Sequence, residues 1–265
     1  MSKKNDIGFE DWNNFLPRLE AAYKAKEFVL VIGPKGVGKN KLAQTFADSV
    51  GKQLESINFS LRTRESHIIG SLSLKEGSSE FNEGILVRSM RKGTMLNLDE
   101  LNAAEPDVLI RTDEALDDRR QIVLKEDGGE VIKAHPDWFV IATINPISHA
   151  GTKELPPQIV SRFPVRIFMD YPSADVEAKI VKLHTGYNDS DIKTAIELAR
   201  KLRERHKEQE LFYAPSIRET IAFARLMKQK IQPREAARMI FRDVYYQWGD
   251  ASANQVEDLI VSMWQ

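Results

Sequence analysis

A glycine-rich stretch near the amino terminus has the residues and the spacing of a phosphate-binding loop. Residues 33–39 read Gly-Pro-Lys-Gly-Val-Gly-Lys, which fits the pattern G-x-x-x-x-G-K. Glycines let the backbone curl so that several N–H groups point at one anion, and the following helix adds the positive end of its dipole. Lys39 is expected to reach the terminal phosphates. The pattern continues with Ser or Thr, whose hydroxyl binds magnesium, but this chain has Asn40 there.

Two carboxylates follow a second apolar run. Residues 95–98, Met-Leu-Asn-Leu, lead directly into Asp99 and Glu100. In open α/β folds, ligands bind at the carboxyl ends of the strands. Beside a phosphate loop, Asp99 would hold magnesium, and Glu100 would polarise the attacking water. Alone, the pair could equally be a strand end followed by the acidic first turn of a helix, but together with the glycine-rich loop it favours nucleotide hydrolysis.

The elements that must position these residues are apolar runs of strand length. Five strands are predicted, at Phe28–Ile32, Leu54–Phe59, Thr94–Leu98, Trp138–Ile144 and Val165–Met169. The fourth run is nearly continuous in apolar residues, which is typical of a strand buried on both faces. Helical stretches separate the runs, and this alternation predicts an α/β fold with a parallel sheet and right-handed crossovers.

The remaining segments divide the chain near residue 171. Residues 60–92 are mixed and polar and are expected to be loop-rich with short helices. A hairpin is predicted around a Gly-Gly turn between Gln121–Lys125 and Glu130–Lys133. Beyond residue 171 only helices are predicted, one running from Pro233 through Tyr245 and the last from Val256 to Trp264. The expected domains are therefore 1–171 (α/β) and 172–265 (helical).

Composition narrows the classes of protein that need to be considered. The chain has 265 residues, is 42% hydrophobic and carries a formal net charge of −1. This near-neutral charge argues against a nucleic-acid-binding surface. The absence of cysteine excludes disulfides and thiolate metal sites. No apolar run approaches membrane-spanning length and the first residues do not resemble a signal peptide, so a cytoplasmic protein is expected.

In order and spacing, these motifs make the chain resemble AAA+ ATPases of the MoxR-like and dynein/midasin-related group. The resemblance covers nearly the whole chain. It rests on residues 33–39, 98–102, 114–117, 142–146, 151–157, 161–163 and 215–218. It implies a five-stranded parallel P-loop NTPase sheet flanked by helices, followed by a small helical lid. It also implies ATP and Mg²⁺ as cofactors and a homo-oligomeric ring, expected to be hexameric.

The resemblance also assigns roles to individual residues. Asn145 matches the sensor-1 position, between the γ-phosphate and the attacking water. Arg162 matches the arginine finger that reaches a neighbouring subunit's nucleotide, with Arg166 as runner-up, and Arg218 matches sensor 2. Asn58 matches a residue that restrains Glu100 in related ATPases. The metal ligands would be Asn40 and Asp99, and the ATP-binding residues Gly33, Pro34, Lys35, Gly36, Val37, Gly38, Lys39, Asn40 and Lys41.

Further implications concern two projecting segments and three departures from the family pattern. Residues 60–92 would correspond to the helix-two insertion and residues 121–133 to the pre-sensor-1 hairpin. Asn40 replaces the magnesium hydroxyl, and Ala103 stands where many relatives carry arginine. Residues 111–113, Arg-Thr-Asp, lie in a helix where relatives are usually more apolar.

The sequence is compatible with three functions. The favoured one is a ring-forming ATP hydrolase that remodels or matures a protein partner, as MoxR-like ATPases do with von Willebrand factor A-domain proteins. The second is a nucleotide-binding structural subunit with impaired hydrolysis, which Asn40 motivates. The third is a DNA-acting translocase or helicase-type motor, which the near-neutral charge disfavours.

Overall fold

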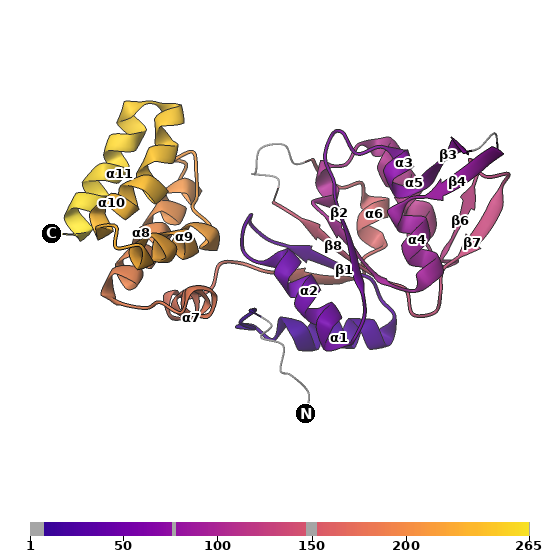
Figure 1. Cartoon of the computed structure of the whole chain (residues 1–265), viewed down its shortest axis with the longest axis horizontal. Coiled ribbons are helices and arrows are strands. Elements are labelled where there is room, and N and C mark those ends of the chain that lie inside the picture. Colours follow the sequence, from indigo (N-terminus) through magenta and orange to yellow (C-terminus); the bar gives the residue numbers. More distant parts are fainter. Residues whose placement is uncertain (1–7, 76–77, 147–152, 265) are drawn as a thin grey trace. The chain divides into compact units, whose positions relative to one another are not determined.

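The computed structural model describes residues 8–75, 78–146 and 153–264 (Figure 1). The chain forms two compact units. The α/β unit contains Asn13–Pro34 and Gly38–Asp170, and the helical unit groups Tyr171–Gln265 with Met1–Trp12 and Lys35–Val37. No helix in the described ranges is both long and apolar enough to cross a membrane.

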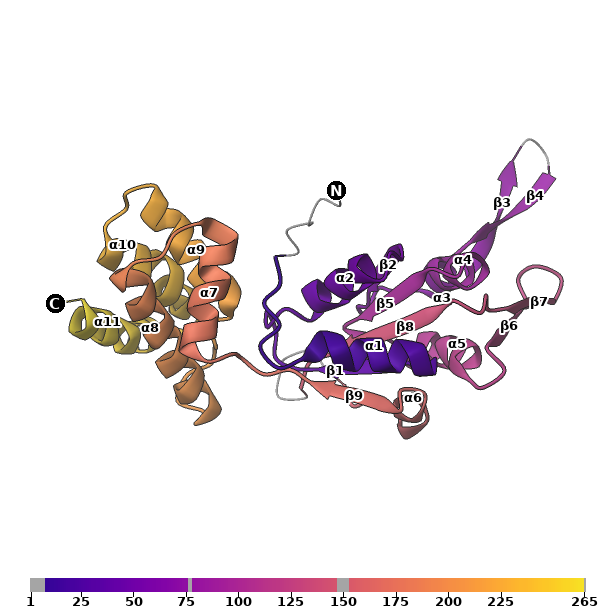
Figure 2. The same cartoon turned by 90° about the horizontal axis from the view of Figure 1, so that it is seen from below.

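A five-stranded parallel sheet lies at the centre of the α/β unit and confirms the predicted fold class (Figure 2). Its strand order is β2-β5-β8-β1-β9. The strands are β1 (Val29–Ile32), β2 (Leu54–Asn58), β5 (Met95–Asp99), β8 (Phe139–Ile144) and β9 (Val165–Phe168). Because all five run in the same direction, the segments that follow β1, β5 and β8 meet at one edge of the sheet.

Helices packed on the sheet fix the start of α2 (Lys39–Ser49), where the loop that follows β1 ends. They include α1 (Phe15–Ala25), α2 itself, α4 (Ile85–Lys92), α5 (Pro106–Leu116) and α6 (Pro157–Ser161). The ring of Phe139 on β8 lies 5.2 Å from that of Tyr23 on α1 and 6.4 Å from that of Phe46 on α2. These buried aromatic contacts hold α1 and α2 to the central strand. The start of α2 is therefore set by core packing.

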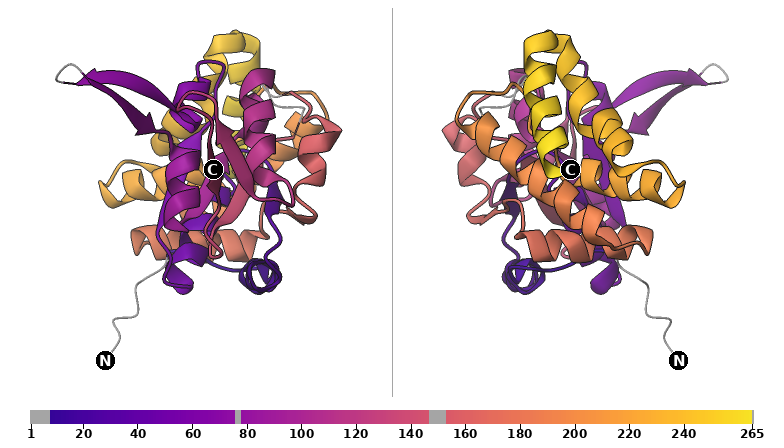
Figure 3. Two further views of the ribbon diagram at one scale, coloured as in Figure 1. Left: turned by 90° about the vertical axis from the view of Figure 1, so that its right-hand side faces the viewer. Right: turned by 90° about the vertical axis from the view of Figure 1, so that its left-hand side faces the viewer.

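The prediction for residues 60–92 was wrong in one respect, because this segment contains a β-hairpin. It begins with α3 (Glu65–Ile68) and continues with β3 (Gly70–Lys75) paired antiparallel to β4 (Ser78–Glu83). The hairpin projects from the α/β unit in Figures 2 and 3. Leu72 and Leu74 are 55% and 83% exposed. The strands thus lack the buried face that makes a strand recognisable from its sequence.

The hairpin that was predicted around the Gly-Gly turn is confirmed. Strands β6 (Gln121–Leu124) and β7 (Glu130–Lys133) pair antiparallel, and Gly128 and Gly129 adopt positive φ in the turn. Ile122 and Ile132 face each other across the pair and are buried.

The helical unit contains only helices and turns among its described residues, as predicted. Its helices are α7 (Ala174–Thr185), α8 (Ser190–Lys207), α9 (Ile217–Lys228), α10 (Pro233–Ala237) and α11 (Asp250–Met263). The helix predicted from Pro233 through Tyr245 is broken, since a π turn (Arg238–Arg242) and a 3-10 helix (Asp243–Trp248) follow α10. Arg238 and Arg242 both donate to Glu257 on α11, which helps hold the irregular segment in place. The last helix starts at Asp250, earlier than predicted.

Candidate nucleotide site

The glycine-rich loop connects β1 to α2 and places the lysine at the first position of the helix. Gly36 and Gly38 adopt positive φ values of 72° and 108°, which L-residues with a Cβ avoid. Lys39 is 7% exposed. Its Nζ donates to the carbonyls of Gly33 (2.7 Å) and Pro34 (2.9 Å) and to Asn145 Oδ1 (2.8 Å). The ammonium group thus lies within the curl of the loop, where anion binding requires it.

Three side chains converge on the carboxylate of Asp99. Asn40 donates to Oδ2 at 2.6 Å, Asn58 donates to Oδ2 at 2.8 Å, and Thr143 donates to Oδ1 at 2.6 Å. Three hydrogen bonds to one carboxylate restrict its rotation. The side chain of Asp99 is therefore held in one orientation beside the first turn of α2.

The donor set around Asp99 fits magnesium. Mg²⁺ prefers hard oxygen ligands and is usually bound through one or two protein ligands together with substrate phosphates. Asp99 offers a carboxylate, and Asn40 offers an amide oxygen that accepts from Asn97 Nδ2 at 3.4 Å. Within the described ranges no group of three or more His, Cys, Asp or Glu side chains could hold a metal independently. The carboxylate of Asp99 and the amide oxygen of Asn40 are the kind of oxygen donors that a metal also bound by substrate phosphates takes.

Glu100 has an unusual backbone conformation for its residue type. Its φ is 55°, in the left-handed region, which costs a non-glycine residue on the order of 1 kcal/mol or more. Its N–H donates to Thr143 Oγ1 at 3.1 Å, and Asn145 Nδ2 donates to Glu100 Oε1 at 3.4 Å. The turn directs the carboxylate away from the course of β5 and towards Asn145.

Asn145 links the lysine to the glutamate. Its Oδ1 accepts from Lys39, and its Nδ2 donates to Glu100. Its backbone carbonyl accepts from Asn102 Nδ2 at 2.9 Å, and the residue is 6% exposed. A polar side chain between a lysine of a glycine-rich loop and a candidate general base is placed where it could contact both a phosphate and a water molecule.

Two contacts in this cluster differ from, or add to, the sequence interpretation. Asn58 was expected to restrain Glu100, but its amide contacts Asp99. Thr143 was not predicted as a site residue, yet it bonds both to Asp99 and to the Glu100 backbone. The register pairs Leu98 with Ala142, so Asp99 and Thr143 come next on neighbouring strands. Strand order, which the sequence alone did not supply, was the missing signal.

The predicted arginines lie outside this cluster. Arg162 follows α6, and its Nε donates to Asp113 Oδ1 at 2.7 Å. This hydrogen bond raises the pKa of Arg162 above its ordinary value, so the guanidinium is charged at any working pH. Arg166, the runner-up, is exposed on β9 and donates to the carbonyl of Val160.

Arg218 belongs to the helical unit and occupies the first turn of α9. Its backbone N–H donates to Ser216 Oγ at 3.2 Å, and Ser216 and Glu219 form a capping box. This cap fixes the start of the helix and hence the place of Arg218 within the unit. Its sensor-2 role remains a prediction. The predicted motif segment that includes Gly151 lies partly outside the described residues.

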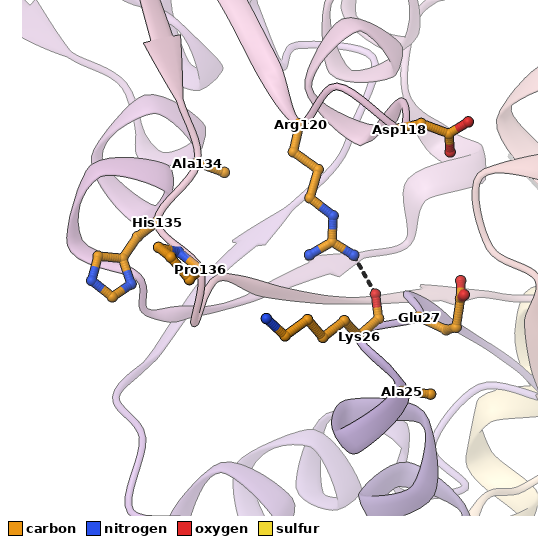
Figure 4. A pocket seen from close by; sticks show the side chains of 8 residues that line it. All are labelled: Ala25, Lys26, Glu27, Asp118, Arg120, Ala134, His135 and Pro136. Carbon is orange, nitrogen blue, oxygen red and sulfur yellow. Dashed lines mark hydrogen bonds between the residues drawn. The ribbon is translucent and has the colours of Figure 1, made fainter.

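A polar pocket of about 400 Å³ lies at the opposite edge of the sheet (Figure 4). Its lining includes Lys26 and Glu27, which precede β1, and His135 and Pro136, which precede β8. Arg120 donates to the carbonyl of Lys26, as the dashed line in Figure 4 shows, and lies 4.6 Å from the centre of the Phe28 ring. This pocket is separate from the phosphate loop, which follows β1 at its other end.

Comparisons with known proteins identify the family of the chain. Residues 28–163 match the AAA domain family (dynein-related subfamily), and residues 177–244 match the CbbQ/NirQ/NorQ C-terminal family. Protein CbbQ of Hydrogenophilus thermoluteolus is 30% identical over 191 residues, covering 72% of this chain and 70% of that protein. An uncharacterized protein of Staphylococcus aureus (strain NCTC 8325 / PS 47) is 32% identical over 198 residues, covering 72% of this chain and 74% of that protein.

Solved structures show the same fold at lower identity. A candidate ATPase of Cytophaga hutchinsonii aligns with a TM-score of 0.56 at 19% identity, covering 98% of this chain and 92% of that chain. A RuvB mutant of Thermotoga maritima aligns with a TM-score of 0.54 at 19% identity, covering 89% of this chain and 72% of that chain. At this identity the likeness concerns the fold alone.

Proposed function

Because the chain belongs to the dynein-related AAA domain family and carries a CbbQ/NirQ/NorQ-type C-terminal region, we propose that it is an ATPase. We propose further that it forms a ring and remodels a protein partner. The observation that carries the proposal is the bridge made by Asn145. One amide touches both Lys39 and Glu100, so the group that would bind the terminal phosphate and the group that would activate water are joined by one side chain.

The chemistry proposed for this cluster is attack of water on the γ-phosphate of ATP. Lys39 and the loop N–H groups bind the phosphates, Asn145 orients the water, and Glu100 accepts its proton. Asp99 and Asn40 would hold Mg²⁺, which neutralises phosphate charge when bound. Arg162 would add a guanidinium from the neighbouring subunit, and Arg218 would couple the helical unit to the nucleotide.

The ring and its partner are inferences from family membership. A finger that serves a neighbouring site requires a homo-oligomer, and a hexamer is the expected form. The partner would be a protein, and the MoxR-like resemblance makes a von Willebrand factor A-domain adaptor the first candidate. The exposed hairpin β3–β4 offers Leu72 and Leu74 for such contacts.

A specific observation supports a second candidate, a nucleotide-binding subunit with impaired hydrolysis. The Asn40 amide donates to Asp99, whereas a metal ligand must present an oxygen. If this hydrogen bond persists when nucleotide binds, the metal is held by fewer protein ligands. ATP would then bind to the loop without efficient turnover.

Phosphate release, measured together with particle mass by light scattering, tests these functions. The wild type is compared with Glu100→Gln and with the control Glu105→Gln, whose carboxylate pairs with Lys153 near the surface. Magnesium-dependent turnover that only Glu100→Gln abolishes supports hydrolysis. ATP binding without turnover in assembled wild-type rings favours the structural subunit. Stimulation of turnover by DNA, lost as salt rises, would instead indicate a nucleic-acid motor.

A further inference from the structure

Arg162 is held through one edge of its guanidinium. Its Nε donates to Asp113 Oδ1 at 2.7 Å, and its Nη2 approaches Oδ2 at 3.4 Å. Among the described residues, Nη1 makes no hydrogen bond. The side chains of Arg162 and Asp113 are 30% and 25% exposed. The Asp113 carboxylate therefore occupies the Nε and Nη2 side of the guanidinium and leaves Nη1 available to bind an anion.

Asp113 stands on a firmly anchored helix. Its neighbour Arg111 is almost buried and contacts Glu65 on α3 (2.5 Å), Glu114 on α5 (2.6 Å) and Glu126 in the β6–β7 turn (3.3 Å). The hydroxyl of Thr112 donates to the carbonyl of Val108, one turn earlier. A buried arginine with several carboxylates resists displacement, because removing its partners leaves a desolvated charge. Asp113 is thus a fixed support for a side chain on another element.

We propose that Asp113 is a positioning residue for Arg162, orienting the guanidinium so that its Nη1 end is presented to the nucleotide of the neighbouring subunit. This inference rests on the proposed function. An arginine side chain has considerable rotamer freedom, and part of that freedom must be lost before it can bind phosphate. A carboxylate that restricts the side chain beforehand reduces this loss at the moment of reaction.

The perturbation that isolates this role is Asp113→Ala. We expect kcat to fall about tenfold, or ~1.4 kcal/mol, while KM for ATP stays unchanged, because the subunit's own phosphate loop is intact. The matched control is Asp118→Asn, which removes a nearby negative charge that is not hydrogen-bonded to Arg162. An equal loss of turnover in Asp118→Asn would show that Arg162 needs only negative charge nearby and not the hydrogen bond to Asp113. That result would overturn the positioning role of Asp113.

A double variant distinguishes positioning from loss of structure. If Asp113 acts only through Arg162, then Asp113→Ala has no further effect on kcat in an Arg162→Ala background. Melting temperatures recorded in parallel show whether the single variant remains folded. A further tenfold fall in the double variant would mean that Asp113 acts by another route.

Mixed rings test whether Asp113→Ala in one subunit lowers ATP turnover at the nucleotide site of the neighbouring subunit. Subunits with Asp113→Ala keep an intact nucleotide site, and subunits with Lys39→Ala keep an intact finger. In a random equal mixture, half of the Asp113→Ala sites receive a sound finger, so turnover per such subunit should rise about fivefold if single-variant loss is tenfold. No rise overturns the role of Asp113 in trans. Absence of turnover in the wild type overturns the proposed function itself.

Discussion

Replacing Asn40 by threonine should lower the Mg²⁺ concentration needed for half-maximal ATP turnover. The Asn40 amide donates to Asp99 Oδ2 at 2.6 Å, and its Oδ1 accepts from Asn97 at 3.4 Å. For this oxygen to face a metal beside Asp99, the amide must turn and give up both hydrogen bonds. A threonine hydroxyl can donate its proton to Asp99 while a lone pair on the same oxygen binds the metal.

The expected change in Mg²⁺ requirement follows from the free energy of the Asn40–Asp99 hydrogen bond, which must break before the Asn40 oxygen can bind the metal. A hydrogen bond to a charged group contributes about 1.5–3 kcal/mol. The lower end applies because Asn40 lies near the surface, where water competes for the carboxylate. A difference of ~1.4 kcal/mol is a factor of ten in an equilibrium constant. Asn40→Thr should therefore lower the half-saturating Mg²⁺ concentration about tenfold.

The assay is a Mg²⁺ titration of phosphate release at saturating ATP, paired with fluorescent-nucleotide binding with and without Mg²⁺. Asn58→Ala is the matched control, since it also removes a hydrogen bond to Asp99 (2.8 Å) but supplies no hydroxyl. The control should not lower the Mg²⁺ requirement. An unchanged or higher requirement in Asn40→Thr would refute the reasoning and show that the amide serves the metal as it stands.

Three further predictions concern the same site and the helical unit. Lys39→Ala should abolish tight ATP binding in a fluorescent-nucleotide titration, and binding at wild-type affinity would contradict its place in the loop. Glu100→Gln should retain ATP but lose turnover by about 10²–10⁴-fold, as phosphate release would show. The hydrogen bond from Arg238 keeps the pKa of Glu257 below its ordinary value, so its stabilisation is present above the unfolded pKa of about 4.3 and is lost as pH falls through the lowered folded pKa. Glu257→Gln should therefore destabilise the helical unit by ~1 kcal/mol near neutral pH and by progressively less in acid, as measured by urea unfolding at several pH values.

The sequence predicted the sheet well because each strand is an apolar run with a distinct end. Met95 and Leu96 are successive residues on β5 and point to opposite faces of the sheet, yet both are completely buried, as are Val140 and Ile141 on β8. Burial on both faces produces the apolar runs that the local sequence shows. The order of strand, glycine-rich loop and helix was predictable for the same reason, and the loop indeed connects β1 to α2. Local patterns of this kind need no knowledge of the fold.

Two contacts between distant segments were not predicted. Thr143 reaches Asp99 only because β5 and β8 are neighbours in register, and nothing local to either residue specifies that pairing. Arg111 likewise looked like a polar intrusion into a helix, yet it is the shared partner of carboxylates on two other segments. Polar clusters in a core depend on which elements meet, whereas periodicity reports only which face each element buries.

The position of β1 in the sheet bears on how the protein is made. This strand precedes the phosphate loop and lies between β8 and β9, with Val29 paired to Ile141 and to Val165. Both partners are synthesised much later than β1, and such non-local pairing is slow to form. A ribosome-bound chain carries the whole loop sequence long before it carries the strands that hold it. Affinity for nucleotide should therefore arise only after β9 has emerged and joined the sheet.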